Sequence, residues 1–476
     1  MRKLTSGWKT NSKSLAILLG CLLLNAVSLH AFDRVENWGF DQGGGYRDGN
    51  FLGEDSELVV TCMKINPEGT KFAVGGALGD FWAVRIYSLV GEGGQPQQLD
   101  HEWNGSQDKN FSTITSMAWV NGKLACGVEY CRDKVMNASV LIIDPGNSGF
   151  VERKLPGNPS WKSLSALRSD PDSSNGDRLW ILGKRGGKTA FGSIDLNDIN
   201  QTPNKPTTVE ITNPRAMALE GNKIWICGEK SNKDSVVKVF DKDSVVKVFE
   251  REGEGEGIVE LAEVNLGEDL YISAMETHGT RVYLTGRSKS KDKMEDFLLV
   301  ALDLVTKKEE VTNKEEVTIE DVWRAKQLAF DGGVGREMGT ALLPLDGGVV
   351  VAGNYHRFWK LGDSNGSRMA VLPAKGEGFE AFLARYDDNG SLRWAQRSDT
   401  PGDDFAVALS KDDNDGALFL GNRIIGSGFG PYVSKVRLEG NESKNVTIVQ
   451  NNDTNDTSEW NPPKTLRLGD RLDSAI

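Results

Sequence analysis

One pattern recurs along this chain of 476 residues: an apolar strand, a short polar turn, and a second apolar strand that ends in glycine. Residues 60–65 with 71–76 form one copy, and residues 114–120 with 123–127 form the next. A single strand pair cannot bury its apolar face alone, so such a repeat predicts a stacked repeat architecture. The glycines that end the second strands lie 45 to 68 residues apart, at Gly76, Gly127, Gly183, Gly228, Gly286, Gly353 and Gly421.

Further strands follow each pair. A third apolar strand runs into an acidic turn, as in residues 139–144 and 297–303, and a fourth strand carries Trp103, Trp323 or Trp394 in three copies. Four strands per repeat and periods near 40–50 residues, lengthened by loop insertions, are typical of propeller blades. The pattern predicts an all-β, seven-bladed β-propeller over residues 32–440.

The seventh repeat lacks a fourth strand of its own, because the chain becomes polar after Leu438. Residues 35–38, near Trp38, have the pattern of an unpaired fourth strand. An open strand edge invites aggregation, so we expect this N-terminal strand to close the ring. The alternative closing strand is residues 446–449.

The later repeats carry a family resemblance. Residues 380–394 read EAFLARYDDNGSLRW, and residues 402–409 read GDDFAVAL. They resemble the repeat of secreted bacterial seven-bladed β-propeller proteins, in which Asp, Phe, Gly and Trp recur at these spacings. The resemblance is clearest over roughly residues 270–440, and the first four repeats depart from it in turn glycines and in the fourth-strand Trp. It implies a fold and no chemistry, because propellers host many functions.

The N-terminus has the order of a secretory signal. Four cations and no acid precede a thirteen-residue apolar run at 15–27, which is too short to span a bilayer. We expect cleavage after Ala31, with Ser28 as the alternative, and a secreted or periplasmic protein. Residues 18–21 also resemble a lipoprotein box, so anchoring through Cys21 is a second alternative. No later stretch has the length of a transmembrane segment, and residues 441–476 predict a polar, disordered tail.

Composition limits the classes of ligand and partner that we expect for this protein. The formal net charge is −12, and loss of residues 1–31 would lower Lys plus Arg from 56 to 52 against 68 acids, giving −16. This charge argues against nucleic acid as a ligand. No metal-ligand spacing and no cofactor motif is present, so we expect neither, and we expect a monomer. Cys126 and Cys227 occupy equivalent core positions and predict buried free thiols, with a Cys126–Cys131 bridge as the alternative.

Two segments are duplicated in tandem. Residues 234–242 are followed at once by a second copy at 243–249, and we assign the third strand of that repeat to residues 236–241. Residues 308–312 recur at 314–318 and predict a solvated hairpin extension.

Cations follow the strand-ending glycines in six of the seven repeats. The loops between second and third strands of a propeller share one face, so these side chains predict a binding ring for an anionic ligand. The alternative is ordinary surface charge. The candidate ligand-binding residues are Arg132, Lys184, Arg185, Lys230, Arg287, Arg357, Trp359 and Arg423.

The longest of these loops spans residues 355–378 and begins with Tyr355, His356 and Arg357. Such a set suits proton abstraction beside a carboxylate, as in a polysaccharide lyase. The alternative is a loop that caps the channel with its own aromatic side chains. We expect a non-catalytic binding or scaffold protein whose partner is a protein or an anionic glycan. The alternatives are the lyase-like enzyme and a structural envelope protein.

Overall fold

The computed structural model describes most of the chain between residues 34 and 437, and the account below is confined to that part. The described residues are 34–38, 58–78, 80–88, 99–105, 111–132, 135–146, 149–155, 160–170, 178–196, 206–231, 242–252, 257–268, 270–289, 295–308, 315–325, 337–356, 359–362, 364, 369–372, 378–397, 404–412, 416–425 and 428–437. The predicted signal peptide and the predicted C-terminal tail lie outside these residues. Among the described residues, no helical segment reaches the length and hydropathy needed to cross a bilayer.

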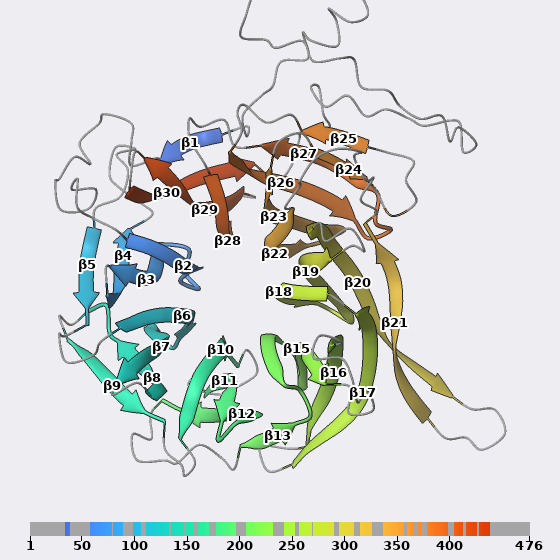
Figure 1. The fold of residues 1–476 in the computed structure, drawn as a ribbon, viewed down its shortest axis with the longest axis horizontal. Helices are drawn as coiled ribbons and strands as arrows, with labels where there is room; N and C mark the ends of the chain where they lie inside the picture. The colour runs from blue at the N-terminus through green and yellow to red at the C-terminus, as the bar shows by residue number, and fades with distance from the viewer. Residues whose placement is uncertain are drawn as a thin grey trace, which may run out of the picture.

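Six blades of four antiparallel strands are each built from successive parts of the chain and lie around a common axis (Figure 1). Blade 1 comprises β2 (Leu58–Ile65), β3 (Lys71–Leu78), β4 (Phe81–Ser88) and β5 (Leu99–Asn104). Blade 2 comprises β6 (Phe111–Val120), β7 (Lys123–Arg132), β8 (Val135–Ile143) and β9 (Phe150–Lys154). Blade 3 comprises β10 (Trp161–Ser169), β11 (Arg178–Arg185), β12 (Lys188–Asp195) and β13 (Thr207–Val209).

The next three blades follow the same order from the axis outward. Blade 4 comprises β14 (Asn213–Glu220), β15 (Lys223–Ser231), β16 (Lys242–Glu252) and β17 (Gly257–Glu268). Blade 5 comprises β18 (Leu270–His278), β19 (Arg281–Lys289), β20 (Glu295–Lys308) and β21 (Glu315–Arg324). Blade 6 comprises β22 (Met338–Leu345), β23 (Gly348–His356), β26 (Phe379–Asp387) and β27 (Leu392–Arg397).

A last four-stranded sheet combines the two ends of the described chain. It contains β28 (Asp404–Asp412), β29 (Gly416–Ile425), β30 (Gly428–Arg437) and β1 (Arg34–Trp38), in the order β1-β30-β29-β28. The predicted all-β propeller is therefore confirmed. The blades made wholly of successive strands number six, and not the seven predicted, because the outer strand of the last sheet lies some 400 residues away in sequence.

The core lies between the faces of neighbouring blades. Second and third strands are buried on both faces, as in β12 and β23, which explains their nearly continuous apolar sequences. Phe297 of blade 5, for example, meets Phe382 of blade 6 edge to face, with ring centroids 5.5 Å apart. The fourth-strand residues Trp103, Trp323 and Trp394 are buried.

A β-bulge interrupts the first strand of every blade and of the last sheet at the same point. One residue of the first strand is left without a partner on the second, so it is the extra residue of the bulge. In blade 2 this residue is Thr115, whose hydroxyl donates to the carbonyl oxygen of Leu164 in blade 3, at 2.9 Å. The seven bulge residues are Thr61, Thr115, Ser165, Arg215, Ser273, Thr340 and Val407.

In blades 3 and 5 the bulge also explains the glycine near the end of the second strand. A Cβ placed on Gly286 would lie 1.9 Å from the carbonyl oxygen of Tyr271, and one on Gly183 would lie 2.0 Å from that of Ser163. The bulged first strand thus approaches its neighbour too closely for any side chain at this point.

Two inserted segments extend the blades. Strands β20 and β21 continue past their neighbours into the predicted charged hairpin, where Lys307 Nζ lies 2.5 Å from Glu320 Oε1. In blade 4, the third strand β16 is formed by the second tandem copy, so our assignment to residues 236–241 is wrong. The register of β16 buries Val245, Val246 and Val248 of this copy.

A cap over the channel is one of the two interpretations of the segment after β23. Its strands β24 (Trp359–Gly362) and β25 (Met369–Leu372) form a small separate sheet instead, drawn outside blade 6 in Figure 1. Leu361 and Leu372 are buried with Trp323 and Tyr386, and the Tyr386 hydroxyl donates to the carbonyl oxygen of Gly362, at 3.0 Å. Burial of these apolar side chains holds the described part of the segment against the outer part of blade 6 and away from the axis.

Candidate functional site

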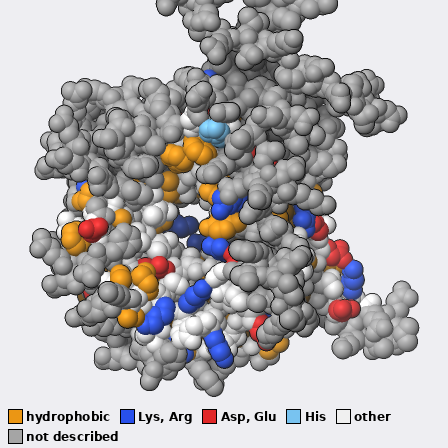
Figure 2. Space-filling model, in the orientation of Figure 1, with side chains coloured by type: hydrophobic (Ala, Val, Ile, Leu, Met, Phe, Trp, Pro, Cys, Tyr) orange, Lys and Arg blue, Asp and Glu red, His pale blue; other side chains and the backbone are white. Residues whose placement is uncertain are grey.

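The starts of the first strands and the ends of the second strands meet at one end of the axis, which we call the mouth. The register pairs Ser163 with Lys184 in blade 3, Asn213 with Glu229 in blade 4, and Tyr271 with Arg287 in blade 5. Polar residues at these positions therefore gather around one opening. Figure 2 shows a face hollowed near its centre, with Lys and Arg side chains over blades 3 and 4.

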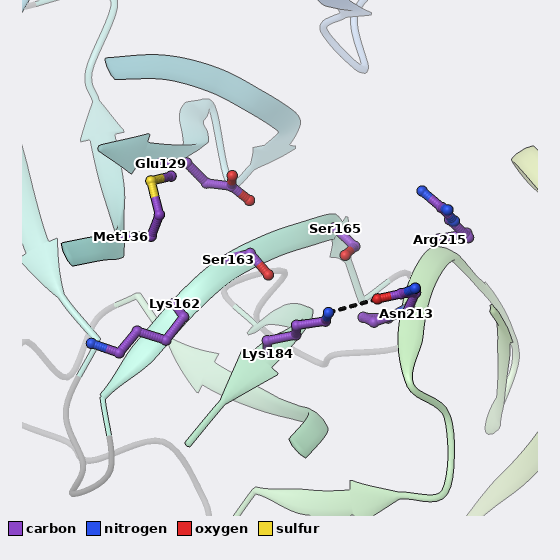
Figure 3. Close-up of a pocket in the computed structure, with 9 residues that line it drawn as sticks. Glu129, Met136, Lys162, Ser163, Ser165, Lys184, Asn213 and Arg215 are labelled. Carbon is purple, nitrogen blue, oxygen red and sulfur yellow. Dashed lines mark hydrogen bonds between the residues drawn. The ribbon is translucent and has the colours of Figure 1, made fainter. Parts of the chain in front are cut away.

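A cavity of about 460 Å³ lies at the mouth between blades 2, 3 and 4 (Figure 3). Three cations and one carboxylate line it, so the described lining is positive overall. Its residues are Glu129, Met136, Lys162, Ser163, Ser165, Lys184, Asn213, Pro214 and Arg215.

A chain of hydrogen bonds orients two of these cations. Lys184 Nζ donates to Asn213 Oδ1 at 2.6 Å, and Asn213 Nδ2 donates to Glu229 Oε2 at 2.6 Å. The other oxygen of Glu229 accepts from Arg215 Nη2 at 2.5 Å. The Arg215 side chain keeps 29% of its surface exposed against 13% for Glu229, so the guanidinium still faces solvent while its position is held.

Glu129 is the one carboxylate in the described lining. Its Oε1 accepts from the backbone N–H of Leu164 at 2.8 Å. Burial raises the pKa of Glu129 above its usual range, and the Leu164 hydrogen bond only partly opposes this. The carboxylate therefore cancels less of the positive charge than a fully exposed glutamate would at mildly acidic pH.

Arg215 also reaches blade 5. Its guanidinium carbon lies 4.1 Å from the centre of the Tyr271 ring, and that of Arg287 lies 4.9 Å from the same centre. Both distances are within the range of cation–π attraction. The cations of blades 4 and 5 are thus tied to one aromatic ring.

A second group of charged residues lies on the first strands, three residues after the bulge position. Arg168 of blade 3 pairs with Glu276 of blade 5, Nη2 to Oε1 at 2.8 Å. Lys64 of blade 1 is close enough to both for their charges to act on it. Burial and the charge of Arg168 lower the pKa of Lys64, while Glu276 acts in the opposite direction.

The structure separates the predicted ligand-binding cations. Lys184 lines the cavity, and Arg287 stacks on Tyr271. Lys230 is turned toward the outer strand of blade 4, where its Nζ lies 2.6 Å from Glu263 Oε1. Arg185 follows Lys184 on β11 and so points to the other side of the strand. The side chains of Arg132, Arg357, Trp359 and Arg423 lie outside the described residues, so the described cations form an arc over blades 3 to 5.

Two of the three predicted lyase residues, Tyr355 and His356, point to opposite faces of β23. Tyr355 is fully buried in the core between blades 5 and 6, and this burial raises the pKa of its hydroxyl. His356 is the next residue of β23, so its side chain points the other way, and it packs on Phe379 with ring centroids 5.2 Å apart. Arg357 lies outside the described residues. A buried tyrosine with a raised pKa is poorly placed to act as a base on a polymer.

Both predicted free thiols are confirmed. Cys126 and Cys227 are buried and unbridged, and burial raises the pKa of Cys227 to about 12. Cys131 is also free. It lies five residues after Cys126 on β7, so the two side chains point to opposite faces of the strand.

Sequence reasoning missed Lys162, Glu129, Arg215 and Tyr271. A usable signal was present at the bulge, where the other repeats carry Thr61, Thr115, Ser165, Ser273, Thr340 and Val407. Arg215 is the only charged residue among these seven positions, and alignment of the repeats on their first strands would have singled it out.

Comparison with known proteins assigns no activity to this chain. No model of a known family matches the chain, and no curated protein matches it. Among solved structures, the chain is similar to the Dos1 propeller at 10% identity, with 80% of this chain and 93% of that one covered and a TM-score of 0.44. Sqt1 from Chaetomium thermophilum is 11% identical, with 81% of this chain and 99% of that one covered and a TM-score of 0.45. Drosophila Semaphorin 2a is 8% identical, with 81% of this chain and 74% of that one covered and a TM-score of 0.45. Likenesses this distant assign no function to the chain.

Proposed function

We propose that this chain is a secreted, non-catalytic binding protein that holds an anionic glycan at the mouth of its propeller. The observation that carries the proposal is the cavity lining, in which the three cations Lys162, Lys184 and Arg215 outnumber the one lining carboxylate, Glu129. Its volume of about 460 Å³ lies within the range of small-molecule binding sites. A sugar unit with a carboxylate or sulfate group has the size and charge for such a site.

The hydrogen-bond chain from Lys184 to Arg215 supports binding because it holds the donors in place before a ligand arrives. Preorganised donors lose less conformational entropy on binding than free side chains do. A guanidinium also presents paired N–H groups that match the two oxygens of a carboxylate or sulfate group. The Lys184 ammonium adds charge without demanding one orientation.

Binding of immobilised polygalacturonate, alginate and dextran sulfate, with neutral dextran as the reference, tests the proposal. We expect retention on at least one polyanion, no retention on dextran, and loss of binding as salt rises. Lys184→Ala and Arg215→Ala should each weaken binding about tenfold, as expected for one charge-assisted hydrogen bond. Lys411→Ala is the matched control, because Lys411 is exposed at the far end of β28. Equal affinity in all three variants, or binding that ignores salt, would contradict the proposal.

We also propose that the last sheet is a seventh blade, and that the N-terminal strand completes it. The proposal is supported by the antiparallel pairing of β1 with β30, which aligns Glu36 with Lys435 and Trp38 with Val433. Deleting residues 1–38 should expose the edge of β30 and promote association, whereas deleting residues 439–476 should not. Light scattering of both variants decides the matter, and the opposite result would favour the alternative closing strand at residues 446–449.

Export through residues 1–31 belongs to the same proposal. N-terminal sequencing of the protein recovered from its producing cells should begin at Phe32, or at Leu29 for the alternative site. A chain that retains Met1 would overturn the secreted assignment.

A further inference from the structure

The third strand of blade 4 is encoded twice in the sequence. Residues 242–252, which form β16, read KDSVVKVFERE, and we call them the downstream segment. Residues 233–243, nine positions earlier, read KDSVVKVFDKD, and we call them the upstream segment. Eight of the eleven positions are identical, and the other three exchange Glu for Asp or Arg for Lys. The chain therefore carries two nearly equal candidates for one strand.

The apolar contacts of β16 come from residues that the two segments share. Val246 is fully buried, and the ring centroids of Phe249 and Phe191 of blade 3 lie 5.0 Å apart. A shift by nine positions would put Val237 in the place of Val246 and Phe240 in the place of Phe249. The same side chains would then be buried in the same core.

The polar contacts of β16 are also preserved by the shift. Lys247 is 4% exposed, and its Nζ lies 2.7 Å from Glu260 Oε1 and 2.6 Å from Glu263 Oε2. Lys238 of the upstream segment is its equivalent, so the shift would leave no buried carboxylate or ammonium unpaired.

The connection at the mouth is long enough for both registers. Lys230 of β15 now pairs with Asp243 of β16. In the shifted register it would pair with Asp234, and residues 231–233 would connect the two strands. Three-residue connections are common in β-hairpins, so the shifted strand can begin without strain.

The opposite end of the blade would accept the displaced residues. Residues 253–256 now connect β16 to β17, and in the shifted register residues 244–256 would do so. The cost of closing a loop grows only with the logarithm of its length. Lengthening one connection while shortening the other therefore changes the free energy of the blade little.

One pair of residues accounts for the register that the structure adopts. Arg251 of the downstream segment forms an ion pair with Asp170 of blade 3, and its guanidinium carbon lies 5.7 Å from the ring centre of Trp180. The shifted register would place Lys242 there. An ammonium lacks the planar fork of a guanidinium, so it forms the weaker contact.

We propose that blade 4 has two strand registers, in which either the downstream or the upstream segment forms its third strand. The change transfers nine residues from the connection at the mouth to the connection at the opposite end. A partner that contacts the long connection at one end would favour one register. This device goes beyond the proposed glycan binding and links the two ends of the ring through a single strand.

Val246→Asp tests the proposal, because a carboxylate in this buried place has no partner. We expect the variant to fold with the upstream segment in the sheet. Limited trypsin digestion with mass spectrometry reports the register, since a strand within a sheet is protected from cleavage. The wild-type protein should be cut after Lys238 and protected after Lys247, and Val246→Asp should show the reverse.

Deletion of residues 234–242 gives the matched control. It joins Lys233 to Asp243, so only the downstream segment remains, with a three-residue connection at the mouth. This single-copy protein should fold. Val246→Asp should lower its melting temperature by about 10 °C or more, against about 3 °C or less in the full chain. Val237→Asp in the full chain should change neither the melting temperature nor the cleavage pattern.

Each result decides the matter. Rescue in the full chain that is lost in the double variant Val237→Asp/Val246→Asp would support the second register. Equal losses of stability for Val246→Asp in both backgrounds, or continued protection after Lys247 in the full-chain variant, would overturn it. A single-copy protein that fails to fold would also overturn it, since the shifted register needs the same short connection. Neither readout involves a ligand, so the outcome is independent of glycan binding.

Discussion

Arg168 of β10 and Glu276 of β18 form an ion pair, Nη2 to Oε1 at 2.8 Å, that joins blade 3 to blade 5 past blade 4. The side chains keep 20% and 30% of their surfaces exposed, so the pair is largely shielded from solvent. Arg168 also donates to the carbonyl oxygen of Met275, at 3.4 Å. A contact between blades that are not adjacent resists both opening of the ring and shear of blade 4.

Replacing Glu276 with Gln should destabilise the protein. The change leaves Arg168 and Lys64 without the carboxylate that offsets their charges, at a cost of about 1–3 kcal/mol. Urea unfolding followed by tryptophan fluorescence measures the change in the free energy of unfolding. Glu316→Gln, at an exposed position of β21, is the control. Coincident curves for the two variants would show that the ion pair contributes nothing.

Replacing Lys64 with Met should stabilise the protein at neutral pH. Folding lowers the pKa of Lys64 below 10.5, so the folded state binds fewer protons than the unfolded state between the lowered pKa and 10.5. The stability of the wild-type protein should therefore rise with pH through that interval. Lys64→Met should remove this rise and gain about 1 kcal/mol at pH 7. Unfolding free energies measured from pH 7 to 10 check it, and an unchanged slope in the variant would refute the assignment.

Replacing Gly286 with Ala should be severely destabilising. The added Cβ would lie 1.9 Å from the carbonyl oxygen of Tyr271, a backbone atom that cannot move without distorting the bulge. We expect a loss of about 2–3 kcal/mol. Gly149→Ala is the matched control, since its Cβ would meet open space. Equal melting temperatures for the two variants would contradict the role given to the bulge.

Replacing Thr115 with Val should weaken the contact between blades 2 and 3. Valine keeps the shape but removes the hydroxyl that donates to Leu164, so the expected loss is about 1 kcal/mol. Thr306→Val, at an exposed position of β20, controls for the gain in strand propensity. Chemical denaturation of both measures the difference, and a Thr115→Val protein as stable as its control would rule out the bridging role.

Anion binding at the mouth should strengthen as pH falls. Burial raises the pKa of Glu129, so protonation removes the negative charge of the described lining at a pH above that of an ordinary glutamate. With dextran sulfate, whose charge stays constant here, affinity should increase roughly threefold or more as pH falls through that pKa. Glu129→Gln keeps an acceptor for Leu164 and should bind at the low-pH strength at every pH. Parallel pH profiles in the two proteins would contradict this.

The repeated strand pair was enough to predict the propeller, because two apolar strands and a glycine near the end of the second strand recur in every copy. The buried, free thiols of Cys126 and Cys227 follow from the same pattern. The position of a residue within the repeat determines whether its side chain is buried, and this position can be read directly from the sequence.

The site was only partly predictable. Lys184 and Arg287 were found because they follow a repeat glycine, but the same rule selected Lys230, which Glu263 draws to the outer strand. Arg215 and Tyr271 were missed because they come together only when blades 4 and 5 are packed side by side. The segment at residues 357–378 was misplaced because the burial of Leu361 and Leu372 depends on blade 6 already being folded.

The recurring bulge has a consequence for how such a ring acquires specificity. Each first strand presents at least one residue that makes no ladder pair, at the shared bulge position, so that residue can change without disturbing the register of the sheet. The Thr115 hydroxyl at this position binds the next blade, and the Arg215 side chain at the same position lines the cavity. The bulge position of each sheet can therefore be substituted independently of the others. Recognition of a new ligand can evolve by single substitutions at these positions while the strands keep their register.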